Sequence, residues 1–489
     1  MTNSNSIDKG DLVQENGNHS QTRESTPNPG PERYKALSLR SPTAQILLIS
    51  LICFCCPGIR NAISGLGGSG QLDSTAAANG NVALLASTAV SALILAPPVF
   101  DIFGPRPCLL VGGWTYALYS GSLLCYNHTE NASFVIASAA MMGLGASLLW
   151  IAQGVIMVSY PIPEWKGRAI AMFWVVFNLG GAIGSFVSFG LNFHSSSGTV
   201  SDGTYGAFMA IMLIGWFLSV FVLPPHKVLR SDGTHAGPPP IEGAKTSPVV
   251  SLKREISNLV TSLSNWRIIL LVPMFFYANF FYSYQENSVN GDTFTLRTRS
   301  LNGAMYWTAQ MVGGLAIGFL LDLRHLKFPY LNLHLHLTRR TQARVGWTFV
   351  FVTGMAIWGG GLAFQMWNDK QDERLDFGDA RTYIGPFWLY FLYGAFDSFW
   401  QSFCYWMMAS LAKSPQEAAK FVGLYKAVQA AGGAVSWRIN ALHYPAMTQF
   451  VINWSLIGAS MVVALPSVLS VTSLPLRGQV KEEGEARPE

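Results

Sequence analysis

Apolar residues occur along the chain in long runs that short polar segments separate. Each run has about 20 residues or more, the length that an α-helix needs to cross a membrane. A longer polar segment near the middle, PPHKVLRSDGTHAGPPPIEGAKTSPVVSLKREISN, divides the runs into two groups of six. We therefore predict membrane-spanning helices over 44–63, 80–100, 107–126, 134–159, 168–191, 204–223, 266–286, 301–321, 345–366, 384–410, 420–440 and 448–471.

The composition agrees with this pattern. Half of the 489 residues are hydrophobic and 12% are charged, whereas soluble domains carry about 25% charge. The mean hydropathy is +0.28. These values predict an all-α, polytopic membrane protein. The opening residues have no apolar core for a cleavable signal peptide, so we expect the first spanning helix to be the targeting signal. No address distinguishes the plasma membrane from a vacuolar or other internal membrane.

The distribution of Lys and Arg predicts the orientation of the chain. Most of the 32 basic residues lie on the side of the membrane that carries the amino terminus, whereas the loop NDKQDERLDFGDAR on the other side is net acidic. Because positively charged loops stay in the cytoplasm, we place both termini there. The predicted organisation is a disordered cytoplasmic tail (1–43), an N-terminal six-helix half (44–223), a cytoplasmic central loop (224–265), a C-terminal six-helix half (266–471) and a cytoplasmic tail (472–489).

An internal repeat relates the two halves. The segment RAIAMFWVVFNLGGAIGS aligns without a gap with KFVGLYKAVQAAGGAVSW, which matches Gly180 and Gly181 to Gly432 and Gly433. The fifth and eleventh helices are therefore equivalent. Two homologous halves in parallel orientation resemble the major facilitator superfamily, which implies twelve transmembrane helices in two pseudo-symmetric six-helix halves. In that fold the fifth helix packs on the eighth, and the second on the eleventh.

The exits of the second and eighth helices resemble the cytoplasmic signature of that superfamily. The first copy, PPVFDIFGPR, has Pro97 at the leading Gly position, and the second copy is GFLLDLRHLK. An acid and a following cation at a helix exit either tie helix ends together at a cytoplasmic gate or form an ordinary interfacial pair. The gate residues that we expect are Asp101, Gly104, Arg106, Gly318, Asp322 and Lys327.

A closer resemblance extends through almost the whole membrane region. The segments RNAISGLGGSGQLD, LWIAQGVIMVSYPIPEWKGRAIAMFWVVFNLGGAIGS, FYSYQENSVN, LNGAMYWTAQMVGG, YGAFDSFWQSFCYWMMASL and GLYKAVQAAGGAVSWR are similar to the fungal branch of the Unc-ninety-three-like family. This family is a divergent major facilitator group. Some of its members resemble transporters, and others are regarded as channel regulators or trafficking partners, so the resemblance implies no single substrate.

Five charged residues lie within or at the ends of the predicted spans: Arg60, Glu286, Asp397, Lys426 and Arg438. A helix rises about 1.5 Å per residue, which puts Lys426 about 9 Å and Asp397 about 16 to 20 Å from the cytoplasmic helix ends. This difference argues against a direct ion pair of the two. Lys426 either extends to the cytoplasmic boundary or faces a cavity. Asp397 is either paired with Arg60, Arg438 or Lys426, or is a site of proton coupling.

Uncharged polar side chains in the spans suggest a polar, aromatic cavity between the halves. An amide there either bonds a neighbouring helix or contacts a solute, and the seventh helix adds tyrosines in FFYANFFYSYQE. The candidates are Gln153, Asn178, Gln310, Gln401, Gln429, Tyr277 and Tyr284.

Other motifs add little chemistry. The sequons at Asn127 and Asn131 share a short loop on the predicted lumenal side and are possible N-glycosylation sites. The six cysteines and nine histidines indicate no metal site, and no nucleotide loop or nucleophile with its base is recognisable. We expect no enzyme, no cofactor and no nucleic-acid partner.

Two functions remain from this reasoning. The first is a secondary transporter in the lipid bilayer that moves a small solute or ion by alternating access, with proton coupling at Asp397. The second is a non-transporting regulator or trafficking partner of another membrane protein.

Overall fold

The structure is a computed structural model that describes residues 38–71, 73–162, 165–194, 199–237, 248–322, 325–328, 333–336, 338–371 and 373–472. Nearly all of both predicted tails lies outside these residues. The first half contains α1 (Pro42–Cys53), the π-helix η1 (Phe54–Gly58), α2 (Ile59–Gly65), α3 (Thr75–Ile94), α4 (Ala96–Phe103), α5 (Pro105–Thr129), α6 (Ala132–Ser159), α7 (Lys166–Leu191) and α8 (Asp202–Leu218). The short 3₁₀ helices are η2 (Gly68–Gly70), η4 (Ser219–Phe221) and η5 (Pro225–Lys227).

The second half follows α9 (Pro248–Leu263). It contains α10 (Trp266–Ile269), α11 (Val272–Tyr277), the π-helix η6 (Tyr284–Gly291), α12 (Leu296–Asp322), α13 (Arg339–Asn368), α14 (Ala380–Leu411), α15 (Pro415–Ala441) and α16 (Ala446–Leu469). A small antiparallel hairpin of β1 (His325–Phe328) and β2 (Leu333–His336) connects α12 to α13. This hairpin was not expected, because the sequence analysis placed only a polar loop there.

In the described residues, nine helices are long and apolar enough to cross a membrane. A tenth candidate combines α9 with α10 and α11, which meet at a bend of 82°. The long helices α14 and α15 have 32 and 27 residues, enough to span the hydrocarbon core, and carry polar residues within their apolar sequence. All twelve predicted runs fall on helical segments, so the prediction of an all-α, polytopic membrane fold is confirmed.

Two spans are interrupted where the sequence pattern predicted continuous helices. Pro57 lies inside η1, where a missing backbone N–H breaks the regular hydrogen-bond ladder between α1 and α2. The span predicted over 266–286 consists of α10, α11 and η6, and it continues to Gly291. Hydropathy reports where a helix crosses a membrane but not how its backbone is wound, so neither interruption was predicted.

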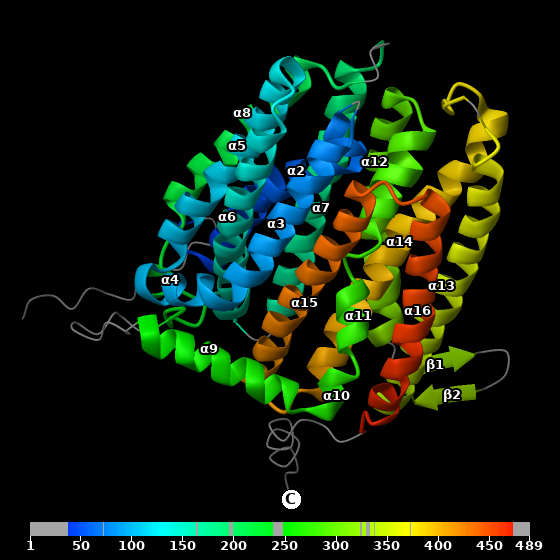
Figure 1. The fold of residues 1–489 in the computed structure, drawn as a ribbon. Coiled ribbons are helices and arrows are strands. Elements are labelled where there is room, and N and C mark those ends of the chain that lie inside the picture. Colours follow the sequence, from blue (N-terminus) through cyan, green and yellow to red (C-terminus); the bar gives the residue numbers. More distant parts are fainter. Residues whose placement is uncertain are drawn as a thin grey trace, which may run out of the picture.

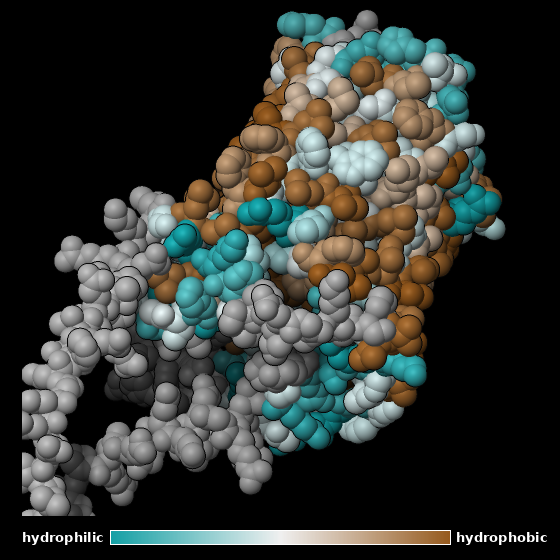
Figure 2. Space-filling model, turned by 90° about the vertical axis from the view of Figure 1, so that its left-hand side faces the viewer, coloured by the Kyte–Doolittle hydropathy of each residue, from teal (hydrophilic) through white to brown (hydrophobic). Residues whose placement is uncertain are grey.

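The helices form one upright bundle in which the two halves lie side by side (Figure 1). At one end, which we call the α9 face, α9 runs across the bundle and contacts α4, α10 and α15. The opposite end, which we call the Asp376 face, carries the loop between α13 and α14. Apolar surface predominates along the middle of the bundle, and hydrophilic surface gathers toward its ends (Figure 2). This distribution fits a molecule that lies in a bilayer.

The halves pack together along two helix pairs that were predicted from the family fold. A Cβ atom added to Gly181 of α7 would meet the Trp307 ring of α12 at 2.7 Å, and one added to Gly433 of α15 would meet Leu85 of α3 at 2.8 Å. Small residues thus allow these helices to approach closely. Gly318 of α12 makes no such close approach, because an added Cβ there meets nothing within 4 Å.

Direct hydrogen bonds join the halves toward the Asp376 face. The Asn290 side chain donates to the Gly65 carbonyl at 2.6 Å, and the Gly68 N–H donates to Asn287 Oδ1 at 2.7 Å. Gly67 lies between these contacts with a φ of +71°, and a Cβ added there would come within 2.3 Å of Gly291 Cα. The two halves are therefore closed against each other at this level.

The orientation of the bundle gives a first testable prediction. Because of the charge bias, we expect Ser231→Cys at the α9 face and Glu373→Cys at the Asp376 face to react with a membrane-impermeant maleimide from opposite sides, the first only after permeabilisation. Intact and permeabilised cells provide the comparison, and a Cys125→Ser background removes the partly exposed native thiol. Labelling of both positions from one side would contradict the predicted topology.

Candidate functional site

Asp397 of α14 lies at the centre of a buried hydrogen-bond network. The residue is 1% exposed. Its Oδ2 atom accepts hydrogen bonds from Tyr282 Oη at 2.6 Å, from Tyr306 Oη at 3.3 Å and from Gln310 Nε2. Tyr306 and Gln310 are four residues apart on α12, so both present their polar groups to the same neighbour. Donors from two chain segments therefore converge on the carboxyl group of a third.

Gln401 extends this network toward α15. It lies one turn after Asp397 on α14, and its Nε2 donates to Asp397 Oδ1 at 3.2 Å and to the Ala278 carbonyl at 3.0 Å. That carbonyl is available because α11 ends at Tyr277. The Oε1 atom of Gln401 accepts from Tyr425 Oη and, at 2.9 Å, from Gln429 Nε2.

Lys426 lies at the end of this chain of contacts. Its Nζ donates to Gln429 Oε1 at 3.1 Å and lies 5.4 Å, 5.8 Å and 5.9 Å from the ring centroids of Tyr425, Tyr405 and Trp150. Such distances are those of cation–π interactions. Trp150 belongs to α6 in the other half, so Lys426 lies between the two halves. That Lys426 faces a cavity stays a prediction.

Asp397 and Lys426 do not form a direct ion pair within the part of the chain that the structure describes; Gln401 and Gln429 link them. The other expected partners of Asp397 lie elsewhere. Arg60 donates to Asn81 Oδ1, and Arg438, which is exposed, donates to Asn79 Oδ1 at 3.0 Å. Both asparagines belong to α3, so the expectation that either arginine neutralises Asp397 is wrong.

The remaining polar candidates separate into two groups. Tyr277 and Tyr284 are buried in the packing of the second half, where Tyr277 contacts the Trp400 ring and Tyr284 donates to Gln365 Oε1 at 2.6 Å. They do not join the Asp397 network. Gln153 makes no side-chain hydrogen bond to any described residue, and Asn178 Oδ1 is buried without a partner.

Glu286 lies on η6 and is 5% exposed. It accepts a hydrogen bond from Ser64 of α2, across the interface between the halves. Next to it, Gln285 accepts from Tyr306 Oη at 2.9 Å, which connects this region to Asp397. The sequence analysis did not select Tyr306, although its spacing of four residues from Gln310 was a usable signal.

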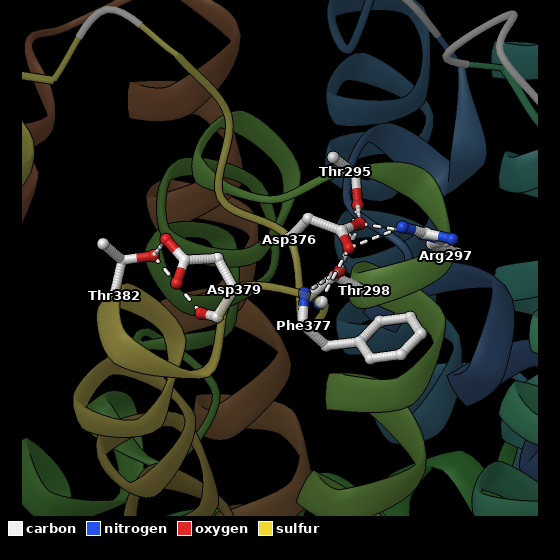
Figure 3. Close-up of polar contacts among 8 residues, drawn as sticks. Thr295, Arg297, Thr298, Asp376, Phe377, Asp379 and Thr382 are labelled. Carbon is white, nitrogen blue, oxygen red and sulfur yellow. Dashed lines mark hydrogen bonds and ion pairs between the residues drawn. The ribbon is translucent and has the colours of Figure 1, made fainter.

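A second polar cluster, which the sequence analysis missed, lies at the Asp376 face. The Asp376 cluster consists of Thr295, Arg297, Thr298 and Asp376, whose side chains point toward one another (Figure 3). Arg297 binds the Asp376 carboxylate through two parallel bonds, from Nε at 2.8 Å and from Nη2 at 2.7 Å. Such a bidentate geometry gives a strong and directional contact. A separate pair, Asp379 and Thr382, begins α14.

Aromatic rings connect the Asp376 cluster to the other half. The Arg297 guanidinium lies 4.9 Å from the Phe377 ring centroid and 5.4 Å from that of Phe193, which follows α7. Phe377 also contacts Phe189 and Phe193. The cluster therefore helps to hold the halves together at this face.

The protonation of Asp376 provides a second prediction. The hydrogen bonds from Arg297 hold the pKa of its carboxyl well below the usual range. The stabilisation is therefore complete above the unfolded pKa of about 3.9 and is lost as the pH falls through the lower folded value. We expect Asp376→Asn to lower the Tm by an amount that is constant from about pH 6 to 8 and shrinks below about pH 4. Thermal unfolding of the native protein and of Asp376→Asn across this pH range measures the difference in Tm. A difference in Tm that persists at low pH would contradict a stabilising role of the charged Asp376 carboxylate.

With this geometry established, comparison with known proteins identifies the family. The sequence matches the family described as "Ion channel regulatory protein UNC-93" over residues 70–328. It is 42% identical to UNC93-like protein 1 of Arabidopsis thaliana over 421 residues, which are 85% of this chain and 87% of the relative. The chain belongs to the UNC-93 family. An UNC93-like protein of Schizosaccharomyces pombe is 39% identical over 452 residues, 91% of this chain and 86% of that protein. The resemblance seen in the sequence is thus confirmed.

Solved structures of similar fold include transporters. The xylose transporter XylE from E. coli, in a partially occluded inward-open conformation, matches with a TM-score of 0.56 at 13% identity, covering 87% of this chain and 97% of that one. The peptide transporter POT in complex with sulfate matches with a TM-score of 0.58 at 12% identity, covering 88% and 96%. At such identities the likeness shows the fold alone. This member of the family therefore has the major facilitator fold.

The residues of the superfamily signature make other contacts than the sequence analysis expected. Asp101 binds Arg254 of α9 at 2.5 Å and also accepts from Ser251, while Arg106 donates to the Val222 carbonyl at 2.8 Å. Gly104, with a φ of +75°, forms the turn between α4 and α5. The tie thus connects α4 to α9. In the second copy, the side chains of Asp322 and Lys327 lie outside the described residues.

The predicted glycosylation sites lie at the Asp376 face, at the end of α5 and the start of α6. Asn127 donates to the Val200 carbonyl at 3.2 Å and to Asp202 Oδ1 at 3.0 Å, and Asn131 accepts from the Ser133 and Phe134 N–H groups as the N-cap of α6. Glycosylation of this UNC-93 protein remains a prediction.

Proposed function

We propose that this UNC-93 protein is a secondary transporter that moves a small solute or ion by alternating access, with a proton bound and released at Asp397. The observation that carries this proposal is the buried Asp397 carboxyl, which receives hydrogen bonds from Tyr282, Tyr306, Gln310 and Gln401. A carboxyl within a membrane is costly and is kept where it has a function. Its affinity for a proton depends on the donors that surround it, and here they come from separate helices.

The Lys426 contacts suggest how a movement of the halves would reach that carboxyl. Lys426 bonds Gln429 in its own half and faces the Trp150 ring of the other half. A change of the interface would alter the position of Lys426 and, through Gln429 and Gln401, the donors to Asp397. In this proposal, Lys426 couples a change at the interface between the halves to proton binding at Asp397.

The test is transport by the purified full-length protein in liposomes. Amino acids, sugars, nucleosides, peptides, inorganic ions and organic acids are offered with and without a proton gradient. The proposal predicts that at least one solute is accumulated above its external concentration only when the gradient is present. If none is transported under either condition while the protein remains folded, the proposal fails.

The description of the matched family as an ion channel regulatory protein favours a second candidate function. In that case the protein would bind a channel subunit in the membrane and change its gating. If the protein transports no solute in liposomes but changes channel currents on co-expression, the result supports channel regulation over transport.

The tie between Asp101 and Arg254 gives a third prediction. Asp101→Asn and Arg254→Gln each remove one partner of their shared ion pair, so we expect both to change the initial transport rate by a similar factor and the double variant to add little. Folding should be nearly unaffected, since exposed ion pairs contribute about 1 kcal/mol or less. Arg106→Ala serves as comparison, because Arg106 bonds Val222 and should combine additively with Asp101→Asn. Additive effects of Asp101→Asn and Arg254→Gln would contradict a shared contact.

A further inference from the structure

Two opposite charges lie near each other between the halves without neutralising one another. Arg60 and Ser64 are four residues apart on α2, so their side chains project on the same side of that helix. Ser64 donates to Oε2 of Glu286 on η6, which brings the carboxyl to this side. Across the described residues, no ion pair of 4.0 Å or less joins Arg60 to Glu286. The arrangement places a cationic side chain and a carboxyl group on the same side of α2.

Arg60 and its partner Asn81 each carry a hydrogen-bond donor that no described residue accepts. Arg60 donates through Nη2 to Asn81 Oδ1, but Arg60 Nε and Asn81 Nδ2 are both buried without a partner among the described residues. Asn81 is 1% exposed. Buried donors in native proteins are almost always satisfied, so two unused donors on contacting side chains are suited to bind an acceptor. A carboxylate offers two acceptor oxygens to such a pair.

The anion has a matching free acceptor. Glu286 receives its described hydrogen bond on Oε2, from Ser64, and no described donor reaches Oε1. An ammonium group has three donors and could bind there.

From these observations we propose that Arg60, Asn81 and Glu286 form the binding site of a small zwitterion of the amino-acid class. The carboxylate of the solute binds Arg60 and Asn81, and its ammonium group binds Glu286. Because the charged residues come from both halves, the solute connects the halves when it binds. This inference rests on the proposed transport function and specifies its substrate class.

The first experiment masks the charges of the solute and leaves the protein unchanged. The full-length protein in detergent is heated with alanine, leucine or glutamine, and in parallel with their methyl esters, which lack the carboxylate, and their N-acetyl forms, which lack the ammonium group. We expect at least one free amino acid to raise the Tm by about 2 °C or more in a saturable manner, and neither masked form to do so. Equal binding of a masked form, or no binding by any free amino acid, overturns the proposal.

The second experiment changes the protein. Arg60→Gln and Glu286→Gln should each weaken binding of the active amino acid at least about tenfold, because each leaves one charge of the solute without its partner. Arg438→Gln is the matched control, since Arg438 also bonds an asparagine of α3, Asn79, but is exposed at another position. An equal loss in the control, or unchanged binding in both site variants, overturns the assignment. If a site variant does not fold, Arg60→Lys, which keeps the charge and loses the planar fork, replaces it.

Binding and transport are separable outcomes. If an amino acid binds in the heating experiment but the protein does not transport it into liposomes, the binding site is supported and the transport function is refuted. Conversely, if the protein transports another solute with a proton gradient but binds no amino acid, the binding site is refuted and the transport function is supported.

Discussion

Asp397→Asn is expected to abolish solute accumulation driven by a proton gradient while preserving exchange of the same solute at zero gradient. The amide keeps the shape of the carboxyl and part of its hydrogen bonding, but it cannot bind and release a proton under these conditions. Tyr282, Tyr306 and Gln310 all donate to the carboxyl. The two tyrosine hydroxyls can also accept from the new amide, so the network should still close.

The measurement is radiolabelled uptake into liposomes, with and without an imposed gradient. We expect gradient-driven accumulation to fall at least about tenfold and exchange to fall less than about threefold, because only the driven process needs proton turnover at this site. Asp369→Asn is the matched control; it makes the same chemical change at the end of α13, where Asp369 accepts from Gln365. Accumulation that survives in Asp397→Asn would exclude this residue as the coupling site.

Lys426→Met is expected to leave the protein folded and to reduce transport at least about tenfold, since it removes the cation–π contact with Trp150 that connects the halves. Methionine is unbranched and apolar, so it fits the helix without the cost of a charge in the membrane. The Tm should therefore remain within about 2 °C of that of the native protein. Uptake and thermal unfolding are measured on the same preparation. A silent substitution would show that Lys426 only extends to the membrane boundary.

Combining Lys426→Met with Asp397→Asn tests how the two residues are connected. For a direct ion pair, Asp397→Asn alone would leave an unpaired cation, and the second change would restore about 1 kcal/mol or more of stability. The structure joins them only through Gln401 and Gln429, so we expect no such recovery. A clear recovery of the Tm in the double variant would indicate that the two side chains meet in another state of the protein.

The sequence analysis located most members of the Asp397 network but not their contacts. Asp397, Gln310, Gln401, Gln429 and Lys426 were all selected because polar groups in apolar runs are costly. Their mutual bonds depend on how each helix is rotated about its axis. Rotation could not be inferred, because helices that are apolar on nearly all sides show little periodicity.

The long apolar runs were sufficient to establish the helical segments and their division into halves, since a chain in lipid must satisfy its backbone groups within each helix. Which side chains contact one another depended on the tertiary structure. Asp101 bonds Arg254, which is 153 residues away, and the Asp376 cluster joins segments 79 residues apart at Arg297. Interruptions such as η1 and η6 further change which side chains face one another. Contacts of this kind arise only when distant helices pack, so no local pattern in the chain encodes them.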